Sequence, residues 1–202
     1  MIVEWAMSVV VEPAEEPLTL TTVKGHLRVD SADEDTFITA LIVAARQYWE
    51  LHHGRALVTQ TLELVLDAWP CGSTISLPRP PLQRVVSITY VDANGQTVTL
   101  AATDYVVAKR SVLGRVVLKD GKAWPSVTMQ AAEAITVRFE TGYGSAAAVP
   151  QLTKQGMLLL VGHLYENREA VVVNDQVDIR EVPLTVQTII ELNRVRYPGP
   201  GR

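Results

Sequence analysis

Apolar residues recur at helical spacing in the first quarter of the chain. They occupy every fourth position over one long stretch, which predicts an amphipathic helix. Ser31 and Glu34 match a capping box at the start of this helix, and Gly54 suits its C-terminal end. The positions that define the apolar face are Phe37, Leu41, Ala45 and Trp49.

A second helical stretch begins at Pro150 and runs to about Asn167. Proline fits the first position of a helix because its missing N–H has no partner there in any case. Apolar residues cover most of the circumference of this helix, so we expect it to be buried on several sides, in a core or in a subunit interface. Pro183 is expected to open a last helix that ends at Leu192 or Asn193.

The middle of the chain has a period of two. From Leu57 to Asp67 apolar and polar residues alternate, which predicts a strand with one buried face. Asn94 and Gly95 predict a hairpin turn, because this pair readily adopts positive φ. The stretch from 169 to 181 has no clear period, and we expect a long functional loop there. Further strands are expected at 74–77, 85–91, 96–100, 105–108, 115–118 and 134–141.

These elements predict an α+β fold. The N- and C-terminal helices would form a helical bundle core, and an antiparallel β-rich insert would lie between them. The expected division is an irregular N-terminal arm at 1–17, a helical core at 18–55 and 150–193, a β-rich insert at 56–141, and an extended C-terminal tail at 194–202 that projects from the fold.

Composition narrows the function classes. The 202 residues are 48% hydrophobic and 20% charged, a balance that can bury a core. The formal net charge is −4, so tight nonspecific binding of DNA is not expected. The net charge does not exclude a local basic patch. Cys71 is the single cysteine, which favours a reducing cytoplasmic context. No signal peptide and no membrane partner are expected, because no apolar run approaches the roughly 18 residues that a span needs.

The residue types that carry catalysis do not gather in a recognisable pattern. No GxSxG, P-loop or HExxH motif is present, and the four histidines and one cysteine form no zinc-ligand spacing. The acidic cluster at 30–35 lacks the spacing of a calcium loop and is explained by helix capping. We therefore expect no catalytic residues, no metal and no cofactor.

The order of several short patterns resembles the phage head–tail connector (adaptor) proteins, in the longer subgroup that carries a β-rich insert. No single motif carries the resemblance, which covers roughly residues 17–195 in combination. The matching stretches are 18–20, 23–30, 33–35, 38–46, 54–57, 77–82, 85–90, 149–150 and 164–169.

The resemblance implies a non-enzymatic structural subunit that forms a ring, expected to be a dodecamer, in the neck of a virion assembled in the bacterial host cytoplasm. The ring would dock on the portal protein, join the next neck or tail component (a stopper or tail terminator), and let DNA pass without tight binding. Candidate portal-docking residues are Arg194, Arg196, Tyr197, Pro198, Pro200 and Arg202. Candidate ring-interface residues are Leu160, His163, Leu164, Glu166, Arg168 and Glu169.

Two other interpretations stay open at the level of sequence. The chain could be another phage neck or tail structural protein, or a stand-alone module whose β-rich part binds a protein. The sequence also leaves open the stoichiometry, the surfaces that meet portal and tail, and whether the source is a phage, a prophage or a gene transfer agent.

Overall fold

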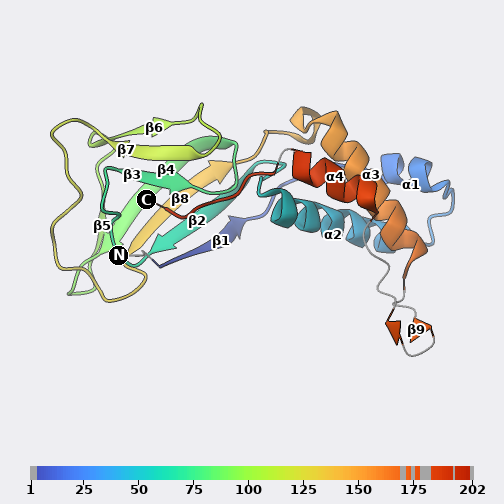
Figure 1. The fold of residues 1–202 in the computed structure, drawn as a ribbon, viewed down its shortest axis with the longest axis horizontal. Helices are drawn as coiled ribbons and strands as arrows, with labels where there is room; N and C mark the ends of the chain where they lie inside the picture. The colour runs from blue at the N-terminus through green and yellow to red at the C-terminus, as the bar shows by residue number, and fades with distance from the viewer. Residues whose placement is uncertain (1–3, 169–171, 174–175, 178–182, 193, 201–202) are drawn as a thin grey trace. The chain divides into compact units, whose positions relative to one another are not determined.

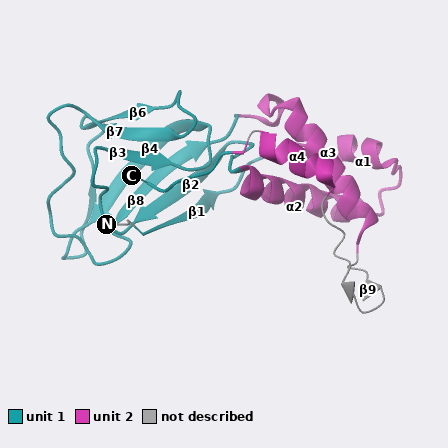
Figure 2. Ribbon diagram, in the orientation of Figure 1, with its two compact units in different colours: residues 1–14, 54–143, 195–202 teal, residues 15–53, 144–194 magenta. Residues whose placement is uncertain are grey.

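The computed structural model describes residues 4–168, 172–173, 176–177, 183–192 and 194–200. The chain divides into two compact units (Figure 2). We call the first, made of residues 1–14, 54–143 and 195–202, the β unit, and the second, made of residues 15–53 and 144–194, the helical unit. The four-part domain division expected from the sequence stays a prediction, since compactness alone does not test independent folding.

The β unit contains a five-stranded and a three-stranded antiparallel sheet (Figure 1). The larger sheet has the order β1 (Trp5–Val11), β2 (Gln60–Leu66), β8 (Ile135–Thr141), β4 (Leu82–Val91) and β5 (Thr97–Thr99). The smaller sheet has the order β3 (Thr74–Leu77), β7 (Gly114–Leu118) and β6 (Tyr105–Ala108).

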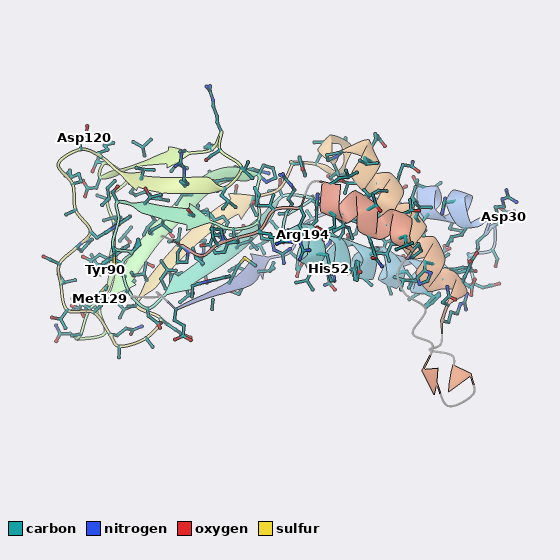
Figure 3. The ribbon with its side chains drawn as sticks, in the orientation of Figure 1. Asp30, His52, Tyr90, Asp120, Met129 and Arg194 are labelled. Carbon is teal, nitrogen blue, oxygen red and sulfur yellow. The ribbon has the colours of Figure 1, made fainter. Side chains whose placement is uncertain are left out.

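The alternation in the sequence produces the core of this unit. Every second residue of β2 is buried, and Leu62 and Leu64 lie opposite Phe139 and Val137 of β8. Strand β8 is paired on both sides, by β2 and β4, so its inward side chains sit at the centre of the sheet. Tyr90 and Met129, labelled in Figure 3, pack against the edge of this core. The buried cluster is Leu62, Leu64, Leu66, Ile75, Leu77, Leu82, Ile88, Leu100, Val116, Ala134, Ile135, Val137 and Phe139.

The helical unit contains the short helix α1 (Leu20–Leu27) and the long helix α2 (Asp35–His53). Thr19 caps α1, since its hydroxyl accepts a hydrogen bond from the Thr22 amide, and Lys24 holds the start of α2 through an ion pair with Asp35 at 2.6 Å. The remaining elements are the 3₁₀ turn η1 (Ala146–Ala148), α3 (Gln151–Glu166), the antiparallel pair β9 (Val172–Val173) and β10 (Gln176–Val177), and α4 (Leu184–Leu192).

Helix α3 approaches α2 closely at one glycine. A Cβ built on Gly156 would lie 2.1 Å from Cη2 of Trp49, whose side chain is fully buried. This position therefore needs glycine for close packing. The other buried apolar side chains of the unit are Leu18, Val23, Ile38, Ile42, Ala45, Val149, Met157, Leu158, Leu160, Val161, Val186 and Ile190.

The prediction of a helical-bundle core with a β-rich insert is wrong. The β unit has its own core, and it recruits residues that the sequence analysis assigned elsewhere. Residues 5–11, expected to be part of an irregular arm, form β1 and pair with β2 from Trp5↔Leu66 to Val11↔Thr61. The physical reason is that the open edge of β2 binds a strand whose apolar residues do not alternate and so gave no local signal.

The capping box at the start of α2 is also absent. The Ser31 hydroxyl accepts a hydrogen bond from the Asp33 amide, and the helix begins only at Asp35. The Glu34 carboxylate is instead bound by side chains from the end of α3. Most of the expected loop at 169–181 lies outside the described residues.

Candidate assembly surfaces

Residues 194–200, which we call the tail segment, run from the helical unit onto the β unit. The Tyr197 hydroxyl donates a hydrogen bond to the Ser76 carbonyl oxygen at 2.8 Å, and the Ser76 amide donates to the Pro200 carbonyl oxygen at 2.8 Å. The Tyr197 ring meets Trp5 edge to face, with 4.9 Å between the ring centroids. The expectation that this segment projects from the fold is wrong for these residues.

Burial fixes the chemical state of Tyr197. Desolvation raises the pKa of its hydroxyl far above the usual value of 10, so the group remains a neutral donor. Pro200 is buried beside it, whereas Pro198 is exposed. The segment thus presents Tyr197 and Pro200 inward to the β unit.

The predicted portal-docking residues therefore fall into different environments. Arg194, labelled in Figure 3, forms an ion pair with Glu191 of α4 at 2.5 Å. Arg196 is exposed, like Pro198. Arg202 lies outside the described residues. On this surface, Arg196 and Pro198 are the candidates that remain free to meet a partner.

The end of α3 forms a second cluster. The Tyr165 hydroxyl donates to the Glu34 carboxylate, and the Arg168 guanidinium pairs with Glu34 at 2.5 Å. The guanidinium also lies over the Phe37 ring, 4.6 Å from its centroid. The hydrogen bonds from Tyr165 and Arg168 lower the pKa of Glu34 below its ordinary value. Arg168, a predicted ring contact, is thus already bound within its own unit.

The other predicted ring-interface residues differ in exposure. Leu160 is 1% exposed and belongs to the helical core. His163 and Leu164 are half-buried, and the His163 carbonyl oxygen accepts a hydrogen bond from the Asn167 side-chain amide at 2.7 Å. Glu166 is exposed on the same helix. The remaining candidate, Glu169, lies outside the described residues.

The hairpin of β6 and β7 carries a local concentration of positive charge. Residues 105–119 contain four basic residues and no acidic one. Lys109, Arg110 and Arg115 line a shallow hollow of about 410 Å³. None of these three forms an ion pair within the described part of the chain. This patch suits an anionic surface rather than a small substrate.

Known proteins show clear similarity to this chain. The family model described as "Phage gp6-like head-tail connector protein" matches residues 17–96. A chain from the neck of an empty gene transfer agent particle, computed with C6 symmetry, has 26% identity and a TM-score of 0.78, with 96% of this chain and 98% of that chain covered. Residues 17–96 are therefore similar to the phage gp6-like head–tail connector proteins, and nearly the whole chain is similar to a particle-neck chain.

Other solved structures have a similar fold. A chain from the neck of a native gene transfer agent particle, computed with C12 symmetry, has 25% identity, a TM-score of 0.72 and coverage of 96% and 98%. A chain from the virion of a native gene transfer agent particle shares the fold at 24% identity and a TM-score of 0.76, with coverage of 96% and 97%. A comparison with curated proteins gives no match.

Helix α3 also exposes an apolar surface that the sequence analysis did not single out. Leu152 is 47% exposed and Leu159 is 40% exposed, and they lie seven positions apart on α3 with exposed Gln155 between them. Residues with this spacing share one face of a helix. The sequence alone gave no preferred face, because apolar residues cover most of the circumference of this helix.

Candidate chemistry in the described residues is limited. Within the ranges that the structure describes, no group of three His, Cys, Asp or Glu side chains could hold a metal ion. Cys71 is exposed. Among the same residues, no helix has the length and apolar character to cross a bilayer. The features that stand out are the exposed α3 face, the basic hairpin and the tail segment, all suited to protein assembly.

Proposed function

We propose that this chain is a structural connector subunit in the neck of a phage-like particle, where it joins head to tail. The observation that carries this proposal is the near-full-length similarity to a particle-neck chain, with 96% and 98% of the two chains covered at 26% identity. Coverage of this extent includes both the helical unit and the β unit, so it favours a connector over a stand-alone binding module.

The subunit acts in a ring of identical copies, for which we propose a dodecamer. Two of the similar chains come from necks computed with C6 and C12 symmetry, and either symmetry is compatible with a dodecamer. A ring subunit needs an apolar surface beyond its own core. The exposed pair Leu152 and Leu159 on α3 supplies such a surface, and exposed Glu166 follows on the same helix.

The ring's partners are the portal protein on the head side and a stopper or tail terminator on the tail side. In this proposal Arg196 and Pro198 of the tail segment contact the portal. The basic hairpin with Lys109, Arg110 and Arg115 offers a complementary surface for an acidic partner protein. A non-enzymatic role and assembly in the host cytoplasm belong to the same proposal, as does a channel through which DNA passes without tight binding.

The test is mass photometry of the cognate portal ring with and without this chain. We expect a mass gain of about one chain per portal subunit at micromolar protein. Absence of any gain would contradict docking on the portal and would direct the search to another neck position.

A paired variant tests the α3 surface in the same assay. Leu159→Asp should weaken ring formation at least about tenfold, because burying one leucine contributes roughly 1.5–3 kcal/mol. Gln47→Asp, at an exposed polar position on α2 outside this face, is the matched control and should assemble normally. Equal assembly of both variants would exclude this helix face from the ring interface.

A further inference from the structure

The β unit has two strand edges that no other strand fills in the described part of the chain. Strand β1 closes one side of the larger sheet and pairs only with β2, and β6 closes one side of the smaller sheet and pairs only with β7. Among the same residues, no backbone hydrogen bond outside these pairings reaches β1 or β6. The two edges lie on opposite sides of the β unit (Figure 1). Each offers unpaired backbone groups to a strand of another chain.

Strand β1 lacks the features that usually keep an edge strand unpaired. Natural edges are protected by lysine, by proline, by a bulge or by very short length. Residues 5–11 contain no charged residue and no proline, and their single register shift lies near the end, between Val9 and Val11. Trp5, Val9 and Val11 are exposed. This edge is therefore apolar and regular as far as Val9, so it suits an extended apolar strand.

The charges that flank the two edges indicate which strand fits. Glu4 precedes β1, whereas Lys109 and Arg110 follow β6, and none of the three forms an ion pair within the residues that the structure describes. Antiparallel pairing of two copies of β1 would bring Glu4 of one close to Glu12 of the other, which is repulsive. Residues 92–104, which contain the edge strand β5, include no basic residue. Strand β6 of a second copy thus matches β1 in charge.

The hydrogen-bond alternation of β1 defines its outward groups. In an antiparallel sheet, alternate residues bond to the same neighbouring strand. The Asp67 amide donates to the Glu4 carbonyl oxygen at 3.3 Å, so every second residue from Glu4 onward bonds to the strand on that side. The backbone groups of Met7 and Val9 therefore face the free edge.

The same rule defines the outward groups of β6. The Lys119 amide donates to the Asp104 carbonyl oxygen at 3.0 Å, in register with the pairing of β6 and β7. The backbone groups of Tyr105 and Val107 therefore face the free edge of β6. Both edges thus present outward groups at every second residue, as an antiparallel pair requires.

We propose that β6 of one copy pairs antiparallel with β1 of the neighbouring copy in the ring and so extends the larger sheet across the subunit boundary. A register with Val107 opposite Met7 joins the outward groups of both strands and brings Arg110 of one copy opposite Glu4 of the other. Because the two edges are different surfaces on opposite sides of one unit, the contact is head to tail and can close into a ring. This inference rests on the proposed ring and names a contact within it.

The first experiment traps this contact in the full-length chain bound to the cognate portal ring. Ser8→Cys and Val106→Cys are combined in a Cys71→Ser background, since Ser8 and Val106 are both exposed and lie opposite each other in the proposed register. Opposite residues that share no backbone hydrogen bond approach within disulfide distance. After mild oxidation we expect a ladder of covalent multimers on a nonreducing gel.

A second cysteine pair is the matched control. Ser8→Cys with Val98→Cys places the partner thiol at an exposed valine on β5, an edge strand outside the proposed contact, and should give at least about tenfold less multimer. Mass photometry of the same samples reports binding to the portal. A mass gain with equal multimer in both double variants, or with none in either, would overturn the strand pairing and leave the proposed connector intact. Absence of a mass gain would overturn the ring and this contact with it.

The third variant tests the charge match. In the chain with Ser8→Cys and Val106→Cys, adding Arg110→Glu should slow cross-linking at least about threefold, because a repulsive pair replaces an attractive one. Adding Glu4→Arg as well should restore the rate, since the pair is then reversed rather than lost. An unchanged rate with Arg110→Glu, or no recovery in the double reversal, would overturn the antiparallel register that places Arg110 opposite Glu4.

Discussion

The β unit and the helical unit reach stability in different ways. The β unit repeats one kind of contact many times, since alternating apolar residues of β2, β8 and β4 pack into a single buried cluster. Its ion pairs, such as Arg138 with Glu63 across two strands, lie at the surface. The helical unit depends on a few particular contacts. They include the buried ion pair of Arg46 and Glu50 and the close packing of Gly156 against Trp49.

Arg46 is the clearest case in the helical unit. Its side chain is 5% exposed, and its Nε lies 2.9 Å from a Glu16 carboxylate oxygen. Its Nη1 lies 3.3 Å from Glu50, whose side chain is 6% exposed. We therefore expect single substitutions at these contacts to lower the free energy of unfolding more than substitutions at the surface of the β unit. The following variants test this contrast.

The largest effect is expected from Arg46→Ala. Loss of the guanidinium removes a buried cation that pairs with Glu16 and Glu50, so the free energy of unfolding should fall by about 3–5 kcal/mol. Arg138→Ala in the β unit breaks an exposed pair and should lower it by less than about 1 kcal/mol. Urea denaturation of both variants measures the difference, and similar losses would remove the contrast between the units.

A smaller effect is expected where α3 meets α2. Gly156→Ala adds a Cβ 2.1 Å from the buried Trp49 ring, and overpacking of this kind costs about 1–3 kcal/mol. Alanine favours a helix over glycine by about 1 kcal/mol, so the steric cost should win and the variant should be destabilised.

Gly25→Ala is the control for this change. Gly25 lies in α1 with no atom within 4 Å of the added Cβ, so only the helix preference acts and the variant should be stabilised. Thermal unfolding of the two variants should shift in opposite directions. A shift of the same sign would show that α2 and α3 can separate enough to accommodate the methyl group.

Local sequence patterns predicted the elements that form by local rules. The alternation from Leu62 to Leu66 gave β2, and the four-residue spacing before Trp49 gave α2. Strand β1 could not be predicted in this way, because its partner Leu66 is far along the chain and Trp5–Val11 has no alternation. A strand pairing between distant segments cannot be predicted from the sequence of either segment alone.

The placement of the tail segment could not be predicted for the same reason. Tyr197 looked like part of a projecting tail, and only the backbone of Ser76, 121 positions away, explains its burial. In α3 the sequence analysis named Leu160 as a candidate ring contact, whereas its neighbour Leu159 is the exposed leucine of the run Leu158-Leu159-Leu160. Which side of an apolar helix stays open depends on how its neighbours pack, and the pattern of that helix does not contain this information.

The smallest expected effect concerns the acid response of the helical unit. The pKa of Glu34 is lowered chiefly by the hydrogen bond from Tyr165 and then by that from Arg168. A carboxylate with a depressed folded-state pKa stabilises the fold fully above its unfolded pKa of about 4.3, and this contribution is lost as pH falls through the lower folded value. Glu34→Gln should therefore destabilise the chain more at pH 7 than at about pH 3.

The measurement is the urea midpoint of wild type and Glu34→Gln at both pH values. The difference between the two proteins should shrink on acidification, because the wild-type carboxylate becomes protonated and the glutamine does not titrate. Glu63→Gln, whose carboxylate pairs with Arg138 at the surface of the β unit, is the matched control and should change less. An equal pH response in both variants would show that the cluster of Glu34, Tyr165 and Arg168 is no more specific than a surface pair, and the contrast between the units would then rest on Arg46 and Gly156 alone.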